Sequence, residues 1–161
     1  MNLLNRNKSH LTDRVDVLRD AVAKVKQQRP FEINAWVVLP DHLHAVWTLP
    51  EGDADYSSRW REIKKHFSKQ LPVNEYRSLT RMKNAERGIW QRRFWEHTIR
   101  DDADYRHHVD YVHINPLKHG YVSAVKDWPY SSFHREVKLD TYAQDWAGGG
   151  VCDEVGGYGE L

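Results

Sequence analysis

The amino-acid sequence predicts an α+β domain in which a split β-α-β-β-α-β sandwich carries one additional helix near its C-terminal end. Two observations support this fold class. Short stretches rich in branched and aromatic residues, typical of strands, occur at residues 33–39 and 43–49. Longer segments place apolar residues at helical spacing, and the two kinds of segment follow one another in the order that such a sandwich requires.

The N-terminal part is expected to contain the end of a first strand, within residues 1–11, followed by a helix. Thr12 or Asp13 can cap this helix, because a side-chain oxygen there can accept the unpaired N–H groups of the first turn. Pro30 is expected to end it. Its apolar positions share one face: Val15, Leu18, Val22 and Val25.

A hairpin is predicted next, because Pro40-Asp41 is turn chemistry between the two strand-like stretches. Side chains alternate along a strand, so His42 and His44 point to the same side, with their Cα atoms about 6–7 Å apart. Two imidazoles at this spacing can bind one metal ion. They can equally be two polar residues on a solvated strand face.

A second helix is predicted over residues 56–70, with Ser57 or Ser58 as its cap. Its apolar stripe contains Trp60, Ile63 and Phe67. Residues 72–88 are polar and predict a loop. Residues 89–99 mix aromatic side chains with arginines, which predicts a strand or an extended arm that either stacks on bases or contributes its aromatic rings to the core.

The last long helix is expected to begin at Asp101 or Asp102 and to end at Asn115, before Pro116. Its core stripe contains Tyr105, Val109 and Val112, and a second stripe contains Asp104, His108, Tyr111 and Asn115. Tyr111 therefore lies off the predicted core face, one turn before the Asn115 amide. Residues 127–133 predict an ordered turn that packs aromatic rings, so we expect one domain over residues 1–135 and an acidic, glycine-rich flexible tail over residues 136–161.

Composition excludes several classes of protein. Charged residues make up 29% of the 161 residues, and no apolar run approaches the eighteen or so that a membrane span needs. The N-terminus has no secretory pattern, and Cys152 is a single cysteine without an internal disulfide partner. We therefore expect a cytoplasmic protein with no membrane partner.

Charge is unevenly distributed along the chain. Residues 59–93 contain eleven Lys and Arg against three Asp and Glu, a local balance of +8. Such a segment either binds a polyanion or forms an ordinary solvated helix face. The residues predicted to bind DNA are Arg59, Lys64, Lys65, Lys69, Arg92, Arg93 and Lys118.

Two histidines on a strand and a side-chain oxygen from a helix make a mixed nitrogen and oxygen site with open positions, which suits Mg²⁺ or Mn²⁺. A closed structural zinc site is not expected, because it would usually need cysteines. A metal ion beside Tyr111 and a basic surface indicates phosphoryl transfer with the phenol as nucleophile.

Four segments resemble the REP-associated tyrosine transposases of the single-tyrosine HUH endonuclease superfamily. They are Asp41-His42-Leu43-His44, Arg93-Phe94-Trp95-Glu96-His97, the segment from Asp110 to Gly120, and the segment from Asp127 to His134. Their order is the family's order, over roughly residues 3 to 146.

The resemblance implies a ferredoxin-like fold and the cleavage and rejoining of single-stranded DNA at hairpin-flanked sites. His42, His44 and Asn115 would hold the metal ion, and Tyr111 would form a 5′-phosphotyrosine. His108 is suggested for proton transfer because it shares the Tyr111 stripe. Relatives open with a complete strand, so the first strand of this chain is expected to be truncated. DNA hairpins are the implied partner, and a homodimer is an alternative to a monomer.

Two other functions stay open at this point. A hairpin-binding protein derived from a transposase would keep the basic surface without the reaction. A metal-dependent phosphodiesterase would use activated water, with Tyr111 only positioning the substrate. A covalent protein–DNA adduct distinguishes the transposase from both.

Overall fold

The computed structural model describes residues 1–148 and shows a mixed α/β protein whose contacts divide it into two compact units. Unit 1 contains residues 1–32, 40–42 and 48–93, and unit 2 contains residues 33–39, 43–47 and the chain from Phe94 onward. Among the described residues, no helix is both long and apolar enough to cross a bilayer. The two units are described separately.

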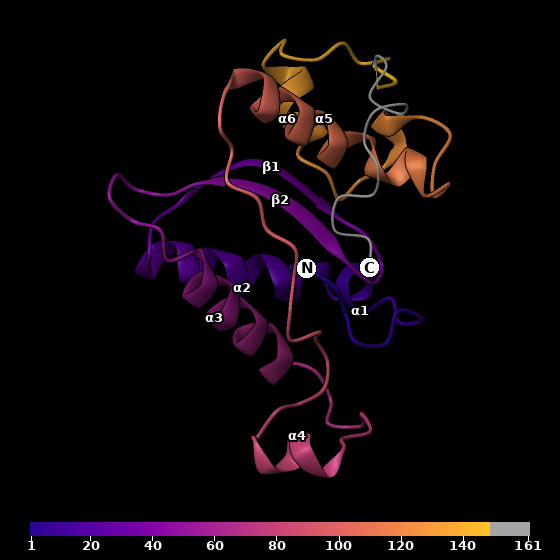
Figure 1. Ribbon diagram of the computed structural model, residues 1–161. Coiled ribbons are helices and arrows are strands. Elements are labelled where there is room, and N and C mark those ends of the chain that lie inside the picture. Colours follow the sequence, from indigo (N-terminus) through magenta and orange to yellow (C-terminus); the bar gives the residue numbers. More distant parts are fainter. Residues whose placement is uncertain (149–161) are drawn as a thin grey trace. The chain divides into compact units, whose positions relative to one another are not determined.

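Unit 1 is built on two helices that lie side by side, α2 (Val15–Gln28) and α3 (Tyr56–Lys69) (Figure 1). Their apolar stripes are buried as predicted except at Val15, which is half-buried. Leu18 and Val25 on α2 and Ile63 and Phe67 on α3 are each exposed by 1% or less. Burial of such stripes is what stabilises amphipathic helices of this length.

The predicted caps of these two helices are wrong. Thr12 and Asp13 lie inside a separate short helix, α1 (His10–Asp13), and the chain breaks at Arg14 before α2 begins. At α3 the cap is Asp55, whose carboxylate accepts from the Ser58 backbone N–H at 3.0 Å. The cap is therefore an aspartate two or three residues before the predicted serines.

The polar segment 72–88, predicted as a loop, contains a short helix, α4 (Leu79–Lys83). Ser78 caps it by accepting from the Arg81 backbone N–H. A five-residue helix has too few apolar positions to produce a periodic pattern, which explains why the sequence did not predict it.

Residues 2–3 pair with two other segments of unit 1. Asn2 forms an antiparallel bridge with His42, and Leu3 forms one with Trp90. No strand forms over residues 89–99, so that alternative is wrong and the extended arm remains. Trp90 anchors the arm's start, because its buried indole donates to Ser68 Oγ at 3.0 Å.

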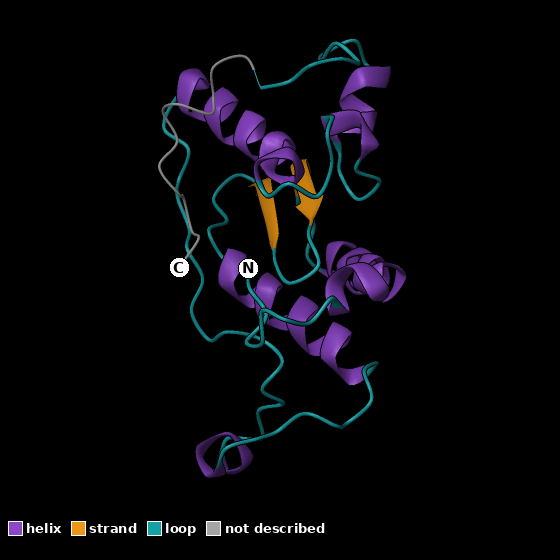
Figure 2. Ribbon diagram, turned by 90° about the vertical axis from the view of Figure 1, so that its right-hand side faces the viewer, coloured by secondary structure: helices purple, strands orange, loops and turns teal. Residues whose placement is uncertain are grey.

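The strands β1 (Glu32–Val38) and β2 (Leu43–Thr48) pair as the predicted hairpin (Figure 2). All their residues belong to unit 2 except the end residues Glu32 and Thr48, which belong to unit 1. The helix α5 (Asp102–Lys118) packs on this pair through Val109 and Val112, which join Ala35, Val37 and Val46 in one buried cluster. This packing fixes the rotation of α5 relative to β2.

Helix α5 begins as predicted, because Asp101 caps it by accepting from the Asp104 backbone N–H. It does not end at Asn115. Pro116 lies within its last turn, and the helix continues to Lys118 before Gly120 takes a left-handed φ of 70°. A proline usually disfavours the helical conformation in the residue before it. Here Ile114 and Asn115, each exposed by 1% or less, remain helical.

The ordered turn predicted over residues 127–133 is confirmed. It follows a 3-10 helix, η1 (Val125–Asp127), and Trp128 Nε1 donates to the Val38 carbonyl at 2.9 Å. It leads into α6 (Phe133–Lys138), where Phe133 is fully buried. Of the segment expected to be a tail, residues 136–148 include the end of α6 and Tyr142, which packs on Phe133. Residues 149–161 lie outside the described part.

Arg59 on α3 is the most buried cation of unit 1, with 1% exposure. Its guanidinium donates to Asp53 at 2.7 Å and to the carbonyl oxygens of Arg29, Pro30 and Asp55. We expect Arg59→Ala to lower the free energy of unfolding by about 3 kcal/mol, because these buried acceptors lose their donor. Denaturant melts would measure the change.

The exposed Arg61 on the same helix provides the control for this prediction. Its guanidinium donates to the Ser58 hydroxyl of the same helix at 3.1 Å, in an exposed hydrogen bond. Arg61→Ala should therefore change the unfolding free energy by no more than about 0.5 kcal/mol. Equal melts for the two variants would show that the Arg59 network does not stabilise unit 1.

Candidate active site

His42 lies in unit 1 and is held by a carboxylate. Its ring is 2% exposed, and Nδ1 donates to Asp41 Oδ1 at 2.8 Å. Burial of Asp41 opposes its ionisation, but hydrogen bonds from His42 and Arg6 outweigh burial and lower its pKa to about 2. Because Nδ1 carries the proton, Nε2 carries the lone pair that a metal ion needs. A carboxylate behind a histidine is the usual support for a metal ligand.

Tyr111 lies on α5 in unit 2 and contacts His44 of β2. The two ring centroids are 5.4 Å apart, with the planes at 89°. The Lys118 ammonium lies 4.9 Å from the centroid of the Tyr111 ring. The structure therefore brings together a strand histidine, a tyrosine and a cation within one unit.

Tyr111 is 4% exposed, so the prediction that this ring lies off the packing face is wrong. Tyr105, predicted on the core stripe, is 36% exposed. The prediction assumed that α5 packs on the domain through one apolar face only. Tyr111 is instead buried against the polar histidine of β2, a contact that apolar periodicity cannot predict.

Asn115 follows one turn after Tyr111 on α5 and is fully buried. Neither its amide oxygen nor its amide nitrogen has a hydrogen-bond partner among residues 1–148. A buried polar group without a partner is costly and calls for an explanation, of which a bound ion is one. The amide oxygen is the type of donor that Mg²⁺ and Mn²⁺ accept.

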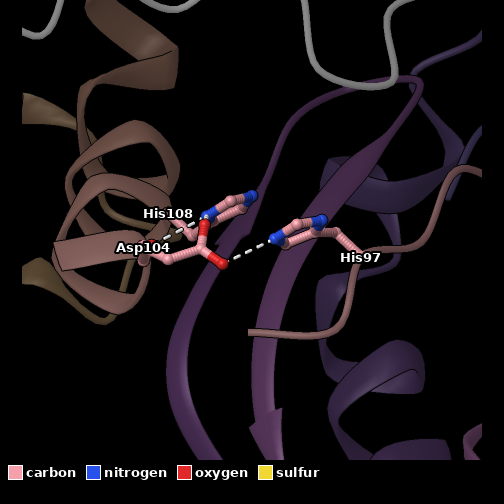
Figure 3. A group of neighbouring side chains, drawn as sticks. All are labelled: His97, Asp104 and His108. Atoms are coloured by element: carbon pink, nitrogen blue, oxygen red, sulfur yellow. Dashed lines mark hydrogen bonds and ion pairs between the residues drawn. The ribbon is translucent and has the colours of Figure 1, made fainter. Parts of the chain in front are cut away.

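His108 belongs to a second polar group in unit 2, with His97 and Asp104 (Figure 3). His97 Nε2 donates to Asp104 Oδ2 at 2.7 Å, and His108 Nδ1 lies 3.1 Å from Asp104 Oδ1 and donates to the Asp104 carbonyl at 2.8 Å. The hydrogen bond from His97 holds the pKa of Asp104 well below its usual range.

The ligand atoms of this second group all lie within 4.8 Å of one another, so the group could hold a metal ion. The two imidazole planes are, however, parallel to within 5°, with centroids 4.6 Å apart. A ring nitrogen's lone pair lies in its ring plane, so the two rings do not converge on one ion as they stand. Asp104 instead hydrogen-bonds to both rings.

The seven predicted DNA contacts divide by exposure. The prediction that Arg59 contacts DNA is corrected, because Arg59 is buried and its guanidinium binds acceptors of unit 1. Lys64 is half-buried and donates to the Gln91 carbonyl at 3.2 Å, and burial lowers its pKa. The other five side chains are exposed: Lys65, Lys69, Arg92, Arg93 and Lys118.

Three residues have contacts that were not predicted from the sequence. Asp41 was interpreted as part of a turn, although an aspartate next to a histidine could have indicated its support. His97 and Asp104 were not proposed as partners of His108. The spacing of Asp104 and His108, four residues apart on one helix, is the signal that could have paired those two.

A helix-borne tyrosine against a strand histidine, with a buried amide one turn further on, defines a polar candidate site. Comparison with known proteins defines the family to which the chain belongs. The chain is 56% identical over 148 residues to the REP-associated tyrosine transposase of Escherichia coli K12, covering 92% of this chain and 82% of that protein. It is 51% identical to a putative REP-associated tyrosine transposase of Haemophilus influenzae, covering 91% and 84%. The chain belongs to the family of REP-associated tyrosine transposases.

A solved structure agrees with this assignment. It shows a REP-associated tyrosine transposase bound to a REP hairpin, and it superposes on this chain with a TM-score of 0.83 and 54% sequence identity. The alignment covers 99% of this chain and 87% of the chain in that structure. No protein-family model matches the chain.

Proposed function

We propose that this protein cleaves and rejoins single-stranded DNA at hairpin-flanked sites through a covalent bond to Tyr111. The observation that carries the proposal is the placement of Tyr111, against His44 and one turn before the buried Asn115 amide. The solved relative bound to a REP hairpin supports hairpin DNA as the substrate.

In the proposed reaction the Tyr111 oxygen attacks the phosphorus of the scissile phosphate. A bond forms between this oxygen and the phosphorus, and the bond from phosphorus to the 3′-oxygen breaks, which leaves a 5′-phosphotyrosine and a free 3′-hydroxyl. The phenol loses a proton and the 3′-oxygen gains one. Attack by another 3′-hydroxyl reverses the step and rejoins DNA, so no ATP is consumed.

His108 is the proton acceptor that we propose for this step. It precedes Tyr111 by three residues on α5, a spacing that places both on one side of the helix. Its Nδ1 donates to the Asp104 carbonyl, so the lone pair is on Nε2. Asp104 thereby fixes the tautomer that can act as a base.

A divalent ion, Mg²⁺ or Mn²⁺, is proposed to bind His42, His44 and Asn115. The residues fit this role: Asp41 fixes the His42 tautomer, and the Asn115 amide is buried without a hydrogen-bond partner in the described chain. When bound, the ion would polarise the scissile phosphate and offset its charge. Lys118, beside the Tyr111 ring, would add a further positive charge.

The ferredoxin-like sheet order is also a proposal. Its support is that residues 2–3 form antiparallel bridges with His42 and with Trp90. These bridges are what a central first strand would make with the third and fourth strands of that fold.

Lys65 and Lys69 are exposed cations of α3 that we expect to contact DNA phosphates. Replacing both with Ala should weaken single-strand binding and lower the slope of log affinity against log salt by about 1.4, since each phosphate contact contributes about 0.7. Titrations at several salt concentrations would measure this. An unchanged slope would remove both lysines from the DNA surface.

The covalent adduct is the experiment that tests the function. A hairpin-bearing single strand incubated with the protein and Mn²⁺ should yield a protein–DNA adduct that survives boiling in detergent. Cleavage without an adduct would favour the phosphodiesterase. Binding without cleavage would favour the hairpin-binding protein.

A further inference from the structure

Trp95 is a large apolar side chain left 45% exposed on the arm that precedes α5. Its exposure alone would be ordinary, since single apolar residues are common on protein surfaces. Its orientation, however, is fixed. The indole plane lies within 8° of the His97 ring and within 10° of the His108 ring, with centroid distances of 5.8 and 5.9 Å.

The two imidazoles are themselves held in place. Asp104 binds His97 through Oδ2 and lies 3.1 Å from His108 Nδ1 through Oδ1, and its Oδ2 also accepts from the Arg100 backbone N–H at 3.0 Å (Figure 3). His97 and Asp104 are mostly buried, with side chains 26% and 10% exposed. The stack of rings therefore presents an exposed indole in one preset orientation.

We propose that Trp95 is a stacking subsite for one unpaired base of the single-stranded substrate, next to the scissile phosphate. The inference rests on the proposed function, because it names a contact for the same DNA strand. Bases stack on aromatic side chains regardless of sequence, and a preset ring loses little conformational entropy on binding.

The position of the stack relative to Tyr111 supports this assignment. His108, which the indole contacts, precedes Tyr111 by three residues, a rise of about 4.5 Å along α5. The ring that the indole contacts thus belongs to a residue about one helical turn before the nucleophile. The Arg100 side chain, 76% exposed and 3.4 Å from Asp104 Oδ2, supplies a positive charge beside the stack for the DNA backbone.

The test measures equilibrium binding of a hairpin-bearing single strand to the full chain, with Tyr111→Phe present throughout to prevent cleavage. Trp95→Ala should weaken binding about 5- to 150-fold, the range expected for loss of one stacked base. Trp95→Phe should restore most of the affinity, because it keeps an aromatic face. Tyr76→Ala, at an aromatic residue 89% exposed in unit 1, is the matched control and should bind normally.

A scan with abasic nucleotides identifies the stacked base. At one position next to the cleavage site, removal of the base should weaken binding by the Tyr111→Phe protein but cause no further loss with Trp95→Ala. Binding by Trp95→Ala within twofold of the parent, or equal sensitivity to every abasic position in both proteins, would overturn the subsite while leaving the proposed function intact. Failure of the parent itself to bind would overturn both.

Discussion

Tyr111→Phe should abolish the covalent protein–DNA adduct and lower cleavage about 10⁴-fold or more, because it removes the nucleophilic oxygen and little else. The ring, its contact with His44 and the nearby Lys118 ammonium remain. Hairpin binding should therefore stay close to that of the parent. Denaturing gels with end-labelled DNA would measure the adduct, and a binding titration would measure the affinity.

Tyr105→Phe is the control for this experiment. Tyr105 lies on the same helix but is 36% exposed, so its hydroxyl should not affect the reaction. Cleavage by Tyr111→Phe at the parent's rate would mean that water or another residue is the nucleophile.

Asp41→Asn should weaken the metal affinity that supports cleavage about 10- to 100-fold, the usual effect of losing the carboxylate behind a histidine ligand. The asparagine amide has almost the same shape as the carboxylate but carries no negative charge. It therefore no longer fixes the His42 tautomer through a charged acceptor for the Nδ1 hydrogen bond. Cleavage rates measured against Mn²⁺ concentration should shift to higher concentrations and recover at saturation. His44→Ala should show a larger loss, because it removes a proposed ligand.

The exposed Asp20 of α2 offers a matched substitution, and Asp20→Asn should leave the Mn²⁺ dependence unchanged. A melt of Asp41→Asn would separate loss of metal affinity from loss of folding. If Asp41→Asn had the parent's Mn²⁺ dependence, Asp41 would not support a metal ligand.

Much of the fold could be predicted from the sequence where side-chain periodicity reports burial. The hairpin, the cores of α2 and α3 and the start of α5 follow from local patterns that the structure keeps. The end of α5 could not be predicted this way. Pro116 is a local signal to stop, whereas Ile114 and Asn115, buried beside it, make contacts that a local rule does not include.

The candidate site shows the same limit. The motifs predicted functional roles for Tyr111, His44 and Asn115, but helical spacing placed Tyr111 on an open face, and the structure buries it. The error arises because the face of α5 that carries polar residues packs on a strand that also carries a polar residue. The prediction for Arg59 was wrong for the opposite reason. A charged side chain was expected at the surface, but Arg59 is buried because carbonyl acceptors from segments distant in sequence bind its guanidinium.

The central claim, that Tyr111 becomes joined to DNA, is tested most directly by locating the adduct. Digestion with trypsin should release residues 107–118, which contain Tyr111 as their single tyrosine. After reaction with a hairpin-bearing strand and nuclease trimming, mass spectrometry should find this peptide heavier by a 5′-linked nucleotide, with fragments that place the added mass on Tyr111. A nucleotide found on another peptide, or complete cleavage with residues 107–118 unmodified, would contradict the account.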